Sequence, residues 1–130
     1  MTQSVDPLST DKATNKLAKL EKLFRKQEKI AAEQAGLARE IIQAWLSELR
    51  TAAVAAPSAA DFNKVAAMIP LPPSTATIAR KALNMSLEEF VTWLKRAVDE
   101  TEGFPFPVVL RRSRHHQKPF VVYAKKRDEQ

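Results

Sequence analysis

The sequence predicts a mainly α (α+β) fold, with a long N-terminal helix, three shorter helices and a C-terminal basic β-hairpin. Three observations support this class. The 130-residue chain contains only two glycines, which disfavours a fold built from many tight hairpins. Residues 12–55 contain no proline and consist mainly of strong helix formers. β-Branched and aromatic residues gather after Gly103, so strands are expected there.

The sequence divides into four regions. Residues 1–11 lack periodicity and are expected to form a flexible lead-in. Residues 12–55 are expected to form one long basic, amphipathic helix, which ends before the next proline. Residues 58–127 are expected to form a small helical core that includes the C-terminal hairpin, and residues 128–130 form a tail.

The long helix carries apolar residues at an approximate heptad spacing, which is typical of a seam between packed helices. Gln27 and Gln34 interrupt this seam, so a weak or short coiled coil is expected, with an antiparallel pair as one arrangement. We therefore predict self-association, or docking on a partner protein, through residues 12–55. The alternative is a helix that breaks at Gly36 and folds back within one monomer, since glycine costs about 1 kcal/mol in a helix interior. The seam residues are Leu17, Leu20, Phe24, Ala31, Ala38, Ile41 and Trp45.

Two short helices are predicted after the long one. Ser58 is the expected N-cap of the first, which should end near Ile69. Ser74 is the expected N-cap of the second, which should end near Leu83.

The fourth helix has clear signals at both ends. Ser86 and Glu89 have the spacing of a capping box, and Gly103 stops a helix that is expected to end near Glu102. Asn84, which precedes it, tolerates a left-handed backbone. The third and fourth helices therefore match the general spacing of a helix-turn-helix motif. A hairpin that follows such a motif would be the wing of a winged-helix domain.

Two features count against a helix-turn-helix motif. Arg80 lies where the motif needs a small residue for close helix packing. Glu88 and Glu89 lie in the first turn of the fourth helix, where they would face phosphates. The alternative is an antiparallel helix pair that is packed for stability alone.

A β-hairpin is predicted from Val108–Arg112 and Phe120–Lys125, with the polar residues 113–119 between them. Residues 103–127 also hold the excess charge of the chain. They contain seven Lys or Arg residues and no acidic residue, a balance of +7 against +6 for all 130 residues. Like charges at this density repel one another unless a polyanion binds them. The basic residues are Arg111, Arg112, Arg114, Lys118, Lys125, Lys126 and Arg127.

This pattern predicts a non-enzymatic nucleic-acid-binding protein whose cationic hairpin contacts the phosphate backbone of DNA or RNA. His115 and His116 in the loop would add hydrogen bonds to these contacts. Four lysines of the long helix are predicted to extend the phosphate-binding track: Lys16, Lys19, Lys22 and Lys26.

Catalysis and cofactor binding are not expected. Only two glycines are present, so glycine-rich phosphate loops are missing and no nucleotide cofactor is predicted. Cysteine is absent, and His115 and His116 are adjacent, so no metal site is predicted. Nuclease activity, with these histidines as acid and base, is a less favoured alternative.

Two other non-enzymatic classes remain as alternatives. The chain would be a structural subunit of a larger ribonucleoprotein or protein assembly, or an accessory or inhibitor protein that binds an acidic protein surface. No long apolar run and no signal-peptide core occur, and cysteine is absent, so a cytoplasmic protein in a reducing compartment is expected, with no membrane partner. A homo-oligomer or a partner protein fits the long helix, and no small-molecule substrate is predicted.

Overall fold

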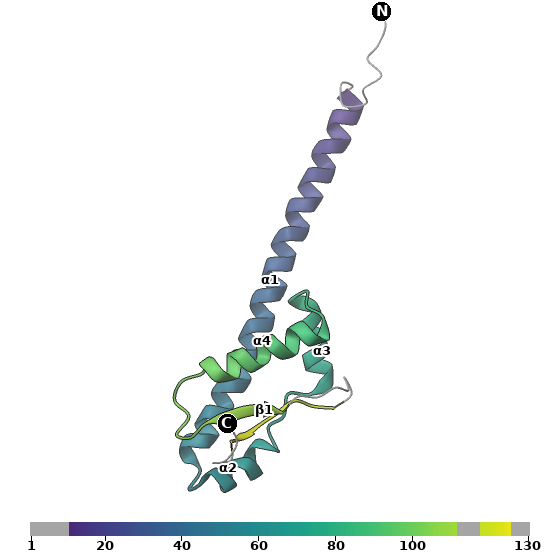
Figure 1. Cartoon of the computed structure of the whole chain (residues 1–130). Helices are drawn as coiled ribbons and strands as arrows, with labels where there is room; N and C mark the ends of the chain where they lie inside the picture. Colours follow the sequence, from purple (N-terminus) through teal and green to yellow (C-terminus); the bar gives the residue numbers. More distant parts are fainter. Residues whose placement is uncertain (1–10, 112–117, 126–130) are drawn as a thin grey trace, which may run out of the picture. The chain divides into compact units, whose positions relative to one another are not determined.

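The computed structural model describes residues 11–111 and 118–125 of the chain (Figure 1). These residues form four helices and one two-stranded antiparallel hairpin, which confirms the mainly helical class. The chain separates into an N-terminal unit, residues 1–34, and a C-terminal unit, residues 35–130. The elements are α1 (Asp11–Ala55), α2 (Ala59–Ala66), α3 (Pro73–Ala82), α4 (Leu87–Glu100), β1 (Val108–Arg111) and β2 (Val121–Ala124).

Helix α1 is continuous from Asp11 to Ala55, so the predicted long helix is confirmed. It passes through Gly36 without interruption, and the hypothesis of a break at this residue is wrong. Strong helix formers on both sides outweigh the roughly 1 kcal/mol that one glycine costs.

The described part of the N-terminal unit is helical, and its side chains remain accessible. Every residue from Thr14 to Gln34 is exposed. Its large apolar side chains are between 37% and 56% exposed, so the face that they form is not buried within this unit. These residues are Leu17, Leu20, Leu23, Phe24 and Ile30.

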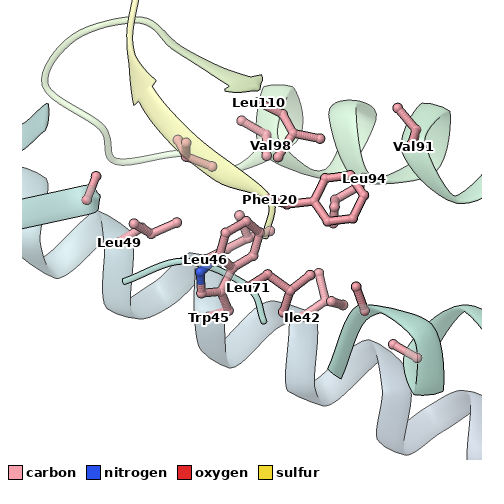
Figure 2. Close-up of a cluster of buried hydrophobic side chains, with 14 of the residues drawn as sticks. Ile42, Trp45, Leu46, Leu49, Leu71, Val91, Leu94, Val98, Leu110 and Phe120 are labelled. Carbon is pink, nitrogen blue, oxygen red and sulfur yellow. The ribbon is translucent and has the colours of Figure 1, made fainter. Parts of the chain in front are cut away.

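The C-terminal unit has one hydrophobic core, to which α1 contributes from Ala38 onward. Figure 2 shows inward side chains of α1 and α4 in this cluster, together with Leu71 and Phe120 from the segments between helices and strands. Trp45 is buried in the core, and its indole Nε1–H donates to the carbonyl oxygen of Ile69 at 2.8 Å. No polar or charged side chain of the described residues is buried.

The apolar side chains in the second half of α1 are only partly buried. Trp45, Leu46 and Leu49 lie in the core, but Leu37 is 60% exposed and Ile41 is 44% exposed. The core of the C-terminal unit covers a narrower stripe of α1 than the sequence pattern offers.

The bounds of α2 and α3 correct two predictions. Helix α2 has the predicted Ser58 N-cap but ends at Ala66, because the amides of Met68 and Ile69 form tight i→i−3 bonds, such as Ile69 N–H to the Ala66 carbonyl. Helix α3 does not use Ser74 as its cap. Pro73 occupies the first helical position, where its missing N–H has no helical partner to lose.

Helix α4 has the predicted capping box. The Ser86 hydroxyl accepts from the Glu89 N–H at 3.2 Å, and the Glu89 carboxylate accepts from the Ser86 N–H at 2.9 Å. The helix ends at Glu100, two residues before the predicted end. Gly103 then has a φ of 99°, and a Cβ at this position would lie 2.7 Å from Cδ of Arg50.

The hairpin is joined to the chain before α3. Val108 of β1 pairs with Ala124 of β2 at one end, and Arg111 pairs with Val121 at the other. Phe120, directly before β2, instead pairs with Leu71 in an isolated antiparallel bridge. Strand β2 is therefore one residue shorter than predicted at each end, and Arg112, the predicted end of the first strand, lies outside the described residues.

The capping box leads to a pH prediction. The hydrogen bond from the Ser86 backbone, followed by that from its hydroxyl, lowers the pKa of Glu89 below its ordinary value of 4.5. The ionised carboxylate therefore stabilises the fold above pH 4.5, and this contribution is lost as pH falls from 4.5 through the lower pKa of the folded state. Glu89→Gln is expected to lose less stability than the wild type between pH 7 and about pH 3, as measured by urea unfolding. Identical losses in both proteins would show that the box does not respond to protonation.

Candidate nucleic-acid interface

The loop end of the hairpin presents two of the predicted contact residues. Arg111 ends β1 and is exposed, and Lys118 is exposed where the described chain resumes. Both residues flank the segment 112–117. The other predicted residues of the basic region lie outside the described residues: Arg112, Arg114, His115, His116, Lys126 and Arg127.

Phe120 anchors this end of the hairpin in the core. Its side chain is buried, and its ring meets the ring of Phe90 edge to face, with centroids 5.9 Å apart. Its backbone N–H donates to the Leu71 carbonyl at 3.1 Å, and its carbonyl accepts from the Leu71 N–H at 2.9 Å. The loop end is therefore held beside the first half of α4 and the start of α3.

Lys125 lies at the opposite end of the hairpin. Its backbone N–H donates to the Pro107 carbonyl at 2.8 Å. Lys125 lines an open groove of about 650 Å³ together with Asp99 and Glu102. In the register of the two strands, Lys125 and Arg111 lie at opposite ends of the hairpin. The structure therefore does not bring Lys125 together with the cations of the loop end.

The four predicted lysines of α1 are all exposed in the N-terminal unit. At about 100° per residue, Lys19, Lys22 and Lys26 share one side of the helix, away from Leu17. Lys16 lies apart from these three, between Leu20 and Leu23 on the apolar side of the helix. Three of the four lysines therefore form one stripe.

The turn between α3 and α4 has the geometry that the sequence indicates. Asn84 has a φ of 56°, which is the left-handed conformation that asparagine tolerates. Arg80 is partly buried beside this turn. Its guanidinium Nη1 donates to the Met85 carbonyl at 3.2 Å, and the small residues buried on α3 are Ala76 and Ala79.

The exposed face of α4 adds cations that the sequence analysis missed. Thr92, Lys95 and Arg96 are exposed, whereas the core side of the helix buries residues such as Leu94. In a count of charge along the chain, neighbouring acidic residues cancel these cations. The helical period nevertheless places the cations on the side of α4 away from the core. Glu89, in the first turn, is held ionised by its cap bonds, which lower its pKa.

Within the described ranges, no three His, Cys, Asp or Glu residues come together as a metal site. Among the helices that the structure describes, none combines the length and apolar character that a membrane span requires. Neither statement covers His115 and His116, which lie outside those ranges.

No protein-family model, no curated protein and no solved structure matches the chain. The function is therefore inferred from the residues and their arrangement alone.

Proposed function

We propose that this protein binds nucleic acid, with the loop end of its hairpin on the phosphate backbone. One observation carries the proposal. Arg111 and Lys118 are exposed at the two ends of a loop that contains no acidic residue, and Phe120 fixes this loop end to the core. A cationic loop on a fixed base binds phosphates with less loss of conformational freedom than a free tail.

The charge of the loop explains why phosphates are the favoured ligand. Residues 111–118 contain four Lys or Arg residues, three of them arginine. A guanidinium group donates two parallel hydrogen bonds to a phosphate, and binding releases the counterions that surround a nucleic acid. An anion that repeats along a backbone satisfies several such groups at once.

The helices beside the loop support a finer hypothesis, in which α3 and α4 form a helix-turn-helix and the hairpin is its wing. The left-handed Asn84 and the buried Ala79 fit the close turn of such a motif. Thr92, Lys95 and Arg96 on the outer face of α4 are of the types that contact base edges in a major groove. The carboxylates at the start of α4 disfavour phosphate contact there, which leaves phosphate binding to the loop.

Fluorescence anisotropy with labelled duplex DNA, single-stranded DNA and duplex RNA tests this proposal. Lys118→Ala is expected to weaken binding to all sequences alike and to reduce the salt slope by about 0.9 for duplex DNA. The double variant Lys95→Ala, Arg96→Ala is expected to change the ranking of duplex sequences.

The matched control is Lys64→Ala, which removes one exposed positive charge from α2. It is expected to change affinity by less than half as much as Lys118→Ala. Wild-type protein that binds none of the three nucleic acids at about 50 mM salt would contradict the proposal. A double variant that weakens all duplexes equally would remove base contact by α4 and leave phosphate contact by the loop intact.

A further inference from the structure

The N-terminal unit carries a heptad seam along one side of its helix, with glutamine at two of its positions. Six residues recur at alternating spacings of three and four, which are the a and d positions of a heptad repeat. All six are exposed. They are Leu17, Phe24 and Ala31 at the a positions, and Leu20, Gln27 and Gln34 at the d positions.

We infer that residues 17–34 pair with the same segment of a second copy, as a parallel, in-register coiled coil. The inference concerns the N-terminal unit and does not rest on the proposed nucleic-acid binding. The parallel orientation differs from the antiparallel pair that the sequence pattern also allowed.

The polar d positions favour a parallel pair in register. In this arrangement each residue faces its own counterpart, so Gln27 meets Gln27 and Gln34 meets Gln34 of the second copy. The two amides of each layer donate to and accept from one another. An antiparallel pair sets d against a positions, which places a glutamine against Phe24 or Ala31 and leaves its amide without a partner.

The flanking charges favour the same orientation. Lys16 is at a g position, and Glu21 is at the e position that a parallel second copy places opposite it. Each pair of chains thus gains two Lys16–Glu21 contacts. An antiparallel pair would instead set e against e positions and bring Glu21 towards Glu28. Glu21 also meets Arg25 within its own helix, but this contact is 3.8 Å long and solvent-exposed, so it competes weakly.

The excess lysines do not oppose this pairing. Lys19, Lys22, Lys26 and Lys29 occupy b, c or f positions, which point away from a second helix. The pairing is expected to be weak, with a Kd of about 10–100 µM, because the seam is short and half of its positions are polar or alanine.

Sedimentation of the full chain, freed of nucleic acid, tests the pairing. The weight-average mass is expected to rise with concentration from 14.6 kDa towards twice that value. Lys16→Glu and Glu21→Lys alone are each expected to weaken association about tenfold, because each places like charges opposite one another. An equimolar mixture of the two variants is expected to recover association, since Glu at 16 then meets Lys at 21. Lys22→Glu is the matched control, which makes the same charge change on the outward side and is expected to leave the mass unchanged.

Cysteine cross-linking reports the orientation directly, because the chain contains no cysteine of its own. Leu20→Cys and Gln34→Cys are each expected to form a covalent dimer with itself on oxidation, since both d positions face their counterparts. An antiparallel pair brings at most one of these two positions to itself. Circular dichroism verifies that each variant keeps its helix content.

Three results would overturn the inference. The first is a wild-type chain that remains a monomer up to about 300 µM, well above the expected Kd. The second is cross-linking of Leu20→Cys only to Ala31→Cys, which indicates an antiparallel pair because it joins a d to an a position. The third is an acidic helical protein that binds residues 17–34 as a heterodimer and excludes the second copy. All of these leave the proposed role of the hairpin unaffected.

Discussion

Replacing Phe90 by alanine is expected to lower the free energy of unfolding by about 3–5 kcal/mol. Phe90 is fully buried, and its ring packs 5.9 Å from the rings of both Phe120 and Trp93. Its removal leaves a cavity where α4 meets the loop end of the hairpin. Because domains of this size are stable by only about 5–15 kcal/mol, the variant loses a large part of its margin. Urea unfolding followed by tryptophan fluorescence measures the change, since Trp45 lies in the same core.

Two variants control this prediction. Met68→Ala removes a side chain that is 82% exposed, so a change within about 0.5 kcal/mol is expected. Phe90→Leu retains much of the buried volume and is expected to fall between the wild type and Phe90→Ala. A loss below about 1 kcal/mol in Phe90→Ala would show that this ring does not hold α4 and the hairpin together.

Replacing Arg111, Arg112 and Arg114 by alanine is expected to weaken binding to duplex DNA by about 10²–10³-fold at about 0.1 M salt. Each arginine is expected to contact one phosphate, and each such contact contributes about 0.9 to the slope of log K against log salt. Anisotropy titration at fixed salt measures this loss.

The matched control for this triple variant removes three exposed positive charges from other elements of the C-terminal unit. Arg39, Lys64 and Lys81 are exposed on α1, α2 and α3, and their joint replacement by alanine makes the same change in net charge. The affinity of this control for duplex DNA is expected to fall by less than about tenfold, because only the long-range electrostatic field changes. Equal losses in both triple variants would indicate a diffuse charge effect and contradict a contact at the loop.

Local signals in the sequence predicted the fold best where neighbouring residues determine the structure. The capping box of Ser86 and Glu89 and the left-handed Asn84 depend on contacts within a few residues, and both are present. The cap of α3 was predicted wrongly because Ser74 has the favoured side chain. The preceding Pro73 already has a backbone angle suited to the first helical position, so it starts the helix earlier.

Contacts between distant segments could not be predicted from the sequence patterns. The bridge between Leu71 and Phe120 joins the chain before α3 to the hairpin, and no local motif indicates it. Asn63 likewise accepts from the Ala124 N–H and ties α2 to β2. The partial exposure of Leu37 and Ile41 depends on how much of α1 the core covers, which periodicity does not specify.

The candidate site was likewise predicted only in part, because the sequence shows local runs of charge but not how the fold places them. The run of basic residues in the sequence identified Arg111 and Lys118, which flank the segment 112–117. The same run included Lys125, which the hairpin register sets at the opposite end. Conversely, Lys95 and Arg96 were missed because acidic neighbours balance them along the chain, although they share the exposed face of α4.

A salt titration of duplex DNA binding tests the central claim most directly. For the wild type, log K is expected to fall linearly with log salt. The four cations of residues 111–118 give a slope of about −3.6 or steeper. For the triple variant of Arg111, Arg112 and Arg114, the slope is expected to be flatter by about 2–3 units. Equal slopes for the two proteins would contradict the account, because they would place the phosphate contacts outside the hairpin loop.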